Sequence, residues 1–300
     1  MKKDGFELAH TQHELAGAKP VKSGDGCVEI STEGEFAIIK GENFEYKFNM
    51  HYGCIEKLDN LLESRLKLGI WRAPTDNDMV VKLDWYKEKY DKMYSKVYET
   101  EILDNTITVK GALSSVSRSK FFTYTAEYTF FQDGRIDVVL DGDFDTSRAF
   151  LPRLGFEAET KEKNFEYFGY GPYESYVDMH HGSKIGMYKS DASSEYVNYI
   201  KPQEHGNHYD TKYLRLGDFE FIAPNGFEFA VSEYSAPELE KKAHNYELVK
   251  SKHTHFRIDY KNSGIGSHSC SLPLADKYKM NDDKVHFQFS VINRNLKEVK

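Results

Sequence analysis

Residues 121–140, FFTYTAEYTFFQDGRIDVVL, carry the clearest structural signal in the chain. From 122 to 130, aromatic and apolar residues alternate with Thr and Glu, which places them on one face of a β-strand. Asp133-Gly134 then interrupts the pattern, and a second alternating run follows from Ile136 to Leu140. Asp-Gly between two such runs is a strong hairpin signal. We therefore predict two antiparallel strands joined at Asp133-Gly134.

The same alternation recurs along most of the chain. Two runs, 219–221 and 227–231, flank Pro224-Asn225-Gly226 and predict a second hairpin, and residues 285–291 predict a further strand. Shorter strand candidates occupy residues 27–49, 98–112, 147–170 and 211–217. The predicted fold class is mainly β, a large antiparallel β-sandwich with one or two short helices.

Two segments depart from the alternation. Five apolar side chains recur at helical spacing and predict a helix through Tyr86, Tyr90, Met93, Tyr94 and Val97. A second, short helix is expected after Ser235, because Ser235 and Glu238 have the spacing of a capping box. Residues 5–16 read as a lone strand followed by a Gly-rich linker. Either this strand docks on the sheet that follows or, as we favour, it belongs to another domain.

Composition excludes several classes of function. Forty Lys and Arg against 48 Asp and Glu leave a net charge of −8, which argues against binding a nucleic-acid backbone. No apolar run approaches the ~18 residues of a membrane helix, and the N-terminal residues lack the apolar stretch of a secretory signal. Three cysteines, Cys27, Cys54 and Cys270, do not suggest a disulfide framework. We expect a cytoplasmic protein without nucleic-acid or membrane partners.

Spacing alone does not reveal an active site. His205, His208 and Asp210 could in principle ligate a metal, but the intervening Gly-Asn predicts a loop, so we predict no metal site. The pairs His180-His181 and His253/His255 fit surface positions better. Phosphate-binding glycine loops and a nucleophile elbow are missing from the sequence. Aromatic residues make up 14% of the chain, which suits a sugar-binding cleft as well as a large sheet.

Four segments resemble, in the same order, motifs in the last domain of family 2 β-galactosidases, the large lactose-cleaving enzymes. Residues 71–78, WRAPTDND, resemble R-A-P-x-D-N-D, and residues 169–178, GYGPYESYVD, resemble G-x-G-P-x-E-x-Y-x-D. Residues 199–207, YIKPQEHGN, resemble Y-x-x-P-x-E-x-G, and residues 264–266 resemble G-I-G. The resemblance implies a galactose-mutarotase-like β-supersandwich over residues 26–300. It implies that residues 1–25 are the tail of an immunoglobulin-like domain and its linker.

The resemblance also implies where the chemistry lies. In the family, the two catalytic Glu residues and the Mg²⁺ ligands belong to a (β/α)8 barrel, so we expect no catalytic or metal-binding residue in this chain. We expect its partners to be the remaining domains or large chain of a β-galactosidase, galactoside sugars and, in the full enzyme, further copies. The expected function is to support the active site and assembly of an enzyme that hydrolyses terminal β-D-galactosides. Two alternatives are a carbohydrate-binding module that acts alone and a mutarotase-like epimerase.

In the family, the loop after the G-I-G run reaches the sugar pocket, where some members place a Trp. Here that loop is Ser267-His268-Ser269-Cys270, one residue shorter, with Cys270 at the Trp position. We predict that His268 and Cys270 line the pocket rim, with a purely structural loop as the equal alternative. The remaining motif residues either fix loops or contact a ligand. They are Arg72, which we expect to pair with Asp76 or Asp78, and Asp76, Asn77, Asp78, Glu174 and Glu204.

Overall fold

The computed structural model describes residues 9–14, 24, 26, 28–267 and 272–296 of the 300-residue chain. The described part is mainly β, as predicted, and every strand pair is antiparallel. Its strands are β1 (Glu29–Glu33), β2 (Phe36–Lys40), β3 (Glu45–Asn49), β4 (Cys54–Leu58), β5 (Lys67–Gly69), β6 (Met93–Leu103), β7 (Thr106–Ser115), β8 (Phe122–Phe130), β9 (Ile136–Phe144), β10 (Arg153–Thr160), β11 (Asn164–Gly171), β12 (Lys184–Asp191), β13 (Asn207–Leu216), β14 (Phe219–Ser232), β15 (Thr254–Asn262) and β16 (Lys284–Asn293). The α-helices are α1 (Val81–Glu88) and α2 (Ala236–Lys241), and short 3-10 helices are η1 (Asp76–Met79), η2 (Tyr90–Lys92), η3 (Asn245–Glu247), η4 (Asp276–Tyr278) and η5 (Arg294–Leu296).

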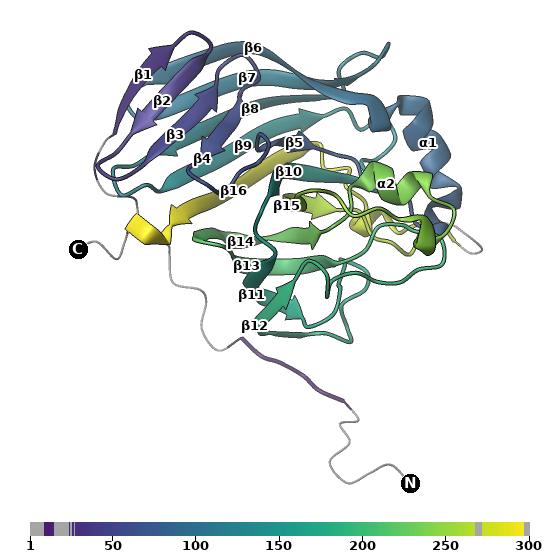
Figure 1. Ribbon diagram of the computed structural model, residues 1–300. Helices are drawn as coiled ribbons and strands as arrows, with labels where there is room; N and C mark the ends of the chain where they lie inside the picture. The colour runs from purple at the N-terminus through teal and green to yellow at the C-terminus, as the bar shows by residue number, and fades with distance from the viewer. Residues whose placement is uncertain (1–8, 15–23, 25, 27, 268–271, 297–300) are drawn as a thin grey trace, which may run out of the picture.

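The strands form two sheets. A small sheet has the order β1-β2-β3-β4, and a large sheet runs β12-β11-β13-β14-β16-β9-β8-β7-β6. A branch leaves the large sheet at β14 and continues through β15 and β10 to β5. Figure 1 shows β1–β4 packed over β6–β9 at one end of the molecule, with α1 and α2 at the other. Phe48 and Tyr128 join the two layers in the core, with ring centroids 4.9 Å apart.

The β8–β9 hairpin confirms the first prediction. Phe130 pairs with Ile136 across the turn, and Gly134 adopts a φ of 79°, a conformation that favours glycine. The alternating residues of β8 are buried on the predicted face. The turn is also held from the small sheet, because the hydroxyl of Tyr46 donates to the carbonyl of Gly134 at 2.9 Å.

The predicted hairpin at Pro224-Asn225-Gly226 is wrong. Both halves of β14 pair with β13 in the same direction, so the chain does not reverse. Between the pairs Tyr213–Ile222 and Thr211–Phe227 the register shifts, and the intervening residues of β14 bulge outward. The two halves have different second neighbours, β16 before the bulge and β15 after it. A bulge of this kind uses the same turn-forming residues as a hairpin, so the sequence pattern does not distinguish the two.

One helix prediction is confirmed and the other is partly wrong. α2 begins as predicted, with the Ser235 hydroxyl accepting the Glu238 amide at 3.2 Å. The helix expected through residue 97 instead ends at Glu88, where Lys89 takes a left-handed φ of 58°. From Met93 onward the chain is β6, hydrogen-bonded to β7, so sheet pairing overrides the helical spacing. None of the helices in the described ranges has the length and apolar character needed to cross a membrane.

Residues 9–14 run along the outer edge of the large sheet without forming a regular strand. The Gln12 carboxamide both donates to the carbonyl of Ile185 in β12, at 2.8 Å, and accepts from its amide, at 2.6 Å. The predicted strand over residues 5–16 is therefore not formed in its described part.

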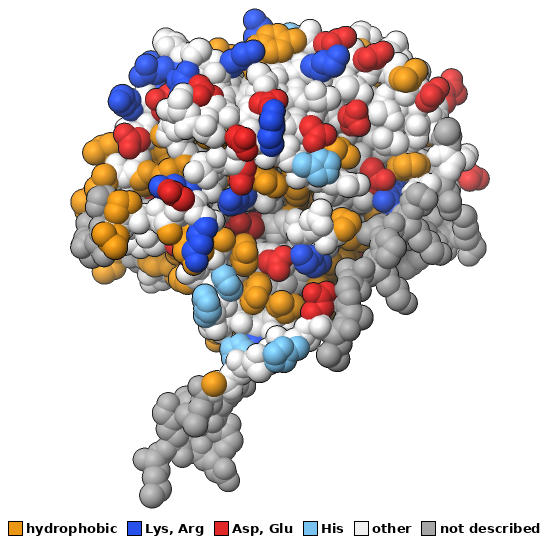
Figure 2. Space-filling model, turned by 180° about the vertical axis from the view of Figure 1, so that it is seen from behind, with side chains coloured by type: hydrophobic (Ala, Val, Ile, Leu, Met, Phe, Trp, Pro, Cys, Tyr) orange, Lys and Arg blue, Asp and Glu red, His pale blue; other side chains and the backbone are white. Residues whose placement is uncertain are grey.

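On the face shown in Figure 2, acidic and basic side chains are interspersed and do not gather into patches of one sign.

Candidate functional site

Two motif segments meet at the side chain of Arg72, which is completely buried. Its guanidinium donates to the Asn262 side chain at 2.8 Å and to the carbonyls of Ser263 and Gly264. It also forms an ion pair with Asp78 at 3.2 Å, one of the two partners expected from the sequence. Arg72 therefore ties the 72–78 loop to the end of β15 and to the Gly264-Ile265-Gly266 turn.

Asp78 is a second buried centre in the same cluster. Its carboxylate accepts the backbone amide of Thr75 at 2.8 Å and the Thr75 hydroxyl at 3.0 Å. The hydroxyl of Ser267 donates to the same carboxylate at 2.5 Å. Asp76, by contrast, is exposed, and its backbone amide donates to Gln203 at 2.8 Å. Asp78 therefore holds Ser267, the last described residue before segment 268–271.

The Gly264-Ile265-Gly266 turn is clamped from a third motif segment. The Asp178 carboxylate accepts the amides of Ile265, at 3.1 Å, and Gly266, at 2.7 Å. A Cβ at position 264 would come within 2.6 Å of this carboxylate, so any larger residue there would displace the Asp178 side chain. On the other side, the Asn77 carboxamide donates to the Ile265 carbonyl at 2.9 Å.

The fourth segment joins through two glutamates. Glu174 accepts the Tyr199 hydroxyl at 2.8 Å and the Gly206 amide at 3.0 Å. Glu204 is buried and forms an ion pair with Arg257. Its backbone amide donates to the carbonyl of Ala73 at 3.1 Å, which joins it to the 72–78 loop. Burial alone would raise the pKa of Glu204, but the Arg257 guanidinium holds it below the usual value. These carboxylates serve as acceptors that position loops. We call the four joined segments the motif cluster (residues 71–78, 169–178, 199–207 and 263–267).

Comparison with known proteins identifies the family of this chain. The family described as "Beta galactosidase small chain" matches residues 40–291. The chain belongs to this family. A β-galactosidase of Actinobacillus pleuropneumoniae is 36% identical over 271 residues, covering 87% of this chain, and one of Staphylococcus xylosus is 28% identical over 308 residues, covering 96%. The chain spans only 27% and 31% of the lengths of these two relatives.

The solved structures that match this chain are more distant in sequence. A galactose mutarotase related enzyme from Lactobacillus acidophilus covers 89% of this chain and 97% of its own, at 9% identity and a TM-score of 0.39. An aldose epimerase homologue from C. elegans covers 86% and 97%, at 8% identity and a TM-score of 0.43.

His205, His208 and Asp210, considered above as possible metal ligands, each have different neighbours in the structure. His208 is buried, with its Nε2 2.9 Å from Glu195 and its ring stacked on Phe229. His205 contacts the Gln203 carbonyl through Nδ1 at 2.8 Å, and Asp210 pairs with Lys212. Within the ranges that the structure describes, there is no group of three or more His, Cys, Asp or Glu residues that could hold a metal ion.

His268 and Cys270 lie outside the described residues, so their predicted contact with a sugar stays a prediction. Only the start of their loop, up to Ser267, is described.

Sequence reasoning missed a buried polar network that supports the motif cluster. Arg153 contacts Asp259 at 2.8 Å, and Arg257 lies 3.0 Å from the other oxygen of the same carboxylate. Glu228 accepts the Asn207 carboxamide at 2.6 Å and the Asn262 amide at 2.9 Å. A signal was available in β15, where Arg257 and Asp259 alternate with apolar residues as surface positions would. The alternation does not indicate that the face carrying Arg257 and Asp259 is largely buried.

Proposed function

We propose that this chain forms the part of a β-galactosidase that completes and supports the sugar pocket. The observation that carries the proposal is the family match over residues 40–291, with a chain that spans 27% to 31% of two β-galactosidase relatives. The catalytic carboxylates and the Mg²⁺ of the enzyme would then reside in its remaining portion. The products are expected to be those of terminal β-galactoside hydrolysis, in the cytoplasm and within an oligomer.

The motif cluster supports this role, because its hydrogen bonds converge on one short turn. Asp178, Asn77 and Asp78 together hold residues 265–267 from three sides. A turn held in this way fixes Ser267, the last described residue before segment 268–271. We propose that His268 and Cys270 of that segment meet the galactoside at the rim of the pocket.

The direct test measures hydrolysis of a chromogenic β-galactoside by this chain, by the remaining portion of the enzyme, and by their mixture. We expect activity only in the mixture. Activity of this chain alone, or full activity of the remaining portion without it, would contradict the proposal.

A substitution tests the motif cluster itself. Asp178→Asn replaces one acceptor oxygen by a donor that faces the Ile265 and Gly266 amides, which loosens the turn. We expect kcat/KM of the mixture to fall by about tenfold or more, while the chain stays folded by circular dichroism. The matched control is Asp104→Asn, at an exposed position in the β6–β7 turn, which should leave kcat/KM unchanged. Equal activity of the two variants would show that the Asp178 clamp has no role in the pocket.

A further inference from the structure

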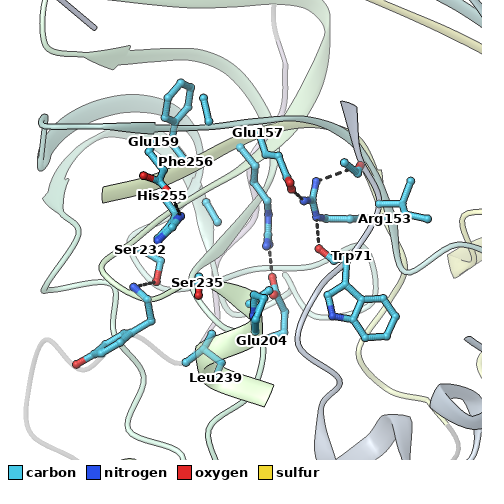
Figure 3. Close-up of a pocket in the computed structure, with 18 of the residues that line it drawn as sticks. Trp71, Arg153, Glu157, Glu159, Glu204, Ser232, Ser235, Leu239, His255 and Phe256 are labelled. Atoms are coloured by element: carbon cyan, nitrogen blue, oxygen red, sulfur yellow. Dashed lines mark hydrogen bonds and ion pairs between the residues drawn. The ribbon is translucent and has the colours of Figure 1, made fainter. Parts of the chain in front are cut away.

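The branch β5-β10-β15-β14 has two faces of opposite character. One face is apolar and packs in the core, with Leu68, Phe156, Ile258 and Phe229 aligned across the four strands. The other carries ionisable side chains, which normally face water in a sheet of this kind. Here α2, Trp71 and residues 204–205 border that polar face and enclose a groove of about 470 Å³ (Figure 3). A volume of this size lies within the range of about 300–1,000 Å³ typical of small-molecule sites.

The floor of the groove consists of two rows of paired side chains. One row, Lys67, Glu157 and Arg257, crosses β5, β10 and β15, and a second, Glu159, His255 and Ser232, crosses β10, β15 and β14. Lys67 lies 3.7 Å from Glu157, and His255 lies 3.7 Å from Glu159. Hydrogen-bond donors and acceptors thus alternate along both rows, and the apolar side chains of Ala230 and Phe256 also line the groove.

Further charges and one aromatic ring complete the groove. Glu204 and Arg153 also line it, each already paired with an opposite charge, as Figure 3 shows. The Trp71 ring lies at its edge and is held there by a 3.0 Å bond from its Nε1 to Glu240. Trp71 is therefore a fixed, partly exposed aromatic surface beside a grid of polar groups.

We propose that this groove binds a neutral polyhydroxylated ligand, a mono- or disaccharide. Each sugar hydroxyl both donates and accepts a hydrogen bond, so it suits a floor on which carboxylates and cations alternate. Glu157, Glu159 and Glu204 each lie within ion-pair distance of a basic side chain, so the charges of the floor largely compensate one another and favour a ligand without net charge. The apolar face of a sugar ring can pack on Trp71. This proposal concerns other residues than His268 and Cys270, so it goes beyond the supporting role proposed above.

The chain offers a direct optical probe, because Trp71 and the fully buried Trp85 are its two tryptophans. We would titrate the chain with galactose and lactose and record tryptophan fluorescence, with galacturonate and galactosamine as anionic and cationic probes. A saturable change is expected for the neutral sugars below about 100 mM, a hundredfold above a millimolar Kd. No saturable change with either neutral sugar, or tighter binding of a charged probe, would overturn the proposal.

A filling variant locates the binding site. Ser232→Phe puts a ring into the groove and should weaken sugar binding by about tenfold or more. Ser31→Phe, at an exposed position in β1, is the matched control and should bind as the unaltered chain does. Isothermal calorimetry with Glu159→Gln gives a second readout, in which loss of an acceptor on the floor should also weaken binding. Unchanged affinity in both groove variants would overturn the assignment. Because binding is measured on this chain alone, the result is separable from the hydrolysis test of the proposed function.

Discussion

At the scale of single residues, Glu228 links stability to pH. Burial raises the pKa of this carboxyl group to about 8, with the nearby Asp259 adding to the effect. Because the folded state binds the proton more tightly, the stabilisation is complete below the unfolded pKa near 4.5 and is lost as pH rises through 8. We expect the free energy of unfolding to decrease from pH 6 towards pH 9, by at most about 1.4 kcal/mol per pH unit from this group.

Urea denaturation across this pH range would test the Glu228 prediction. Glu228→Gln removes the titrating group and should flatten the pH dependence, whereas the exposed Glu127→Gln in β8 should keep it. Parallel curves for Glu228→Gln and the unaltered chain would assign the pH dependence to other groups.

The residues of the site could be predicted from the sequence only in part. The pairing of Arg72 with Asp78 was expected because both stand in one short motif, six positions apart. Arg257 and Glu204 come from segments 53 positions apart, and nothing in their local spacing relates them. Long-range pairs of this kind depend on the strand order, which local alternation does not determine.

At the scale of elements, the sequence predicted correctly those elements whose hydrogen bonds join residues close together in the chain. The β8–β9 hairpin pairs neighbouring residues, so its turn chemistry sufficed. The β14 bulge and the β6 strand depend on partners elsewhere in the sheet, and in both cases the local pattern predicted the wrong element. The bulge nevertheless favours glycine at position 226, where φ is positive. Replacing this glycine and two others by alanine measures how strong that preference is.

We expect Gly226→Ala to destabilise the chain more than the same change at two other glycines. Gly226 has a φ of 83°, and a Cβ there would lie 2.7 Å from Asp210 and 2.8 Å from Lys212. Gly34 has a φ of 63° but open space, and Gly182 has open space without a positive φ. Gly34→Ala should therefore cost about 1–2 kcal/mol in free energy of unfolding, Gly226→Ala more, and Gly182→Ala little. Chemical denaturation would rank the three, and a Gly226→Ala effect no larger than that of Gly182→Ala would contradict the bulge geometry.

At the scale of the whole molecule, the large sheet connects two ends that share one hydrophobic core. β6–β9 pack under the small sheet, whereas the branch through β15 lies beside α2, and β14 and β16 join the two within one hydrogen-bonded array. Trp85 is part of α1 and Trp71 packs against it, whereas Phe48 lies in β3 of the small sheet, at the other end of the molecule (Figure 1). The chain therefore carries reporters at one end and a deeply buried aromatic residue at the other.

This separation makes cooperativity testable. Phe48 is fully buried against Tyr128, so Phe48→Ala should lower the free energy of unfolding by about 3–5 kcal/mol. If the sheet couples both ends, tryptophan fluorescence and far-UV circular dichroism should shift to the same lower urea midpoint, although neither tryptophan touches residue 48. Leu103→Ala, at an exposed position in β6, is the control. It should change the free energy of unfolding by no more than about 0.5 kcal/mol, whichever of the two signals is used. A fluorescence midpoint that stays in place while the dichroism midpoint falls would mean that the two ends unfold separately, because the continuous hydrogen bonding through β14 and β16 would then be too weak to join them.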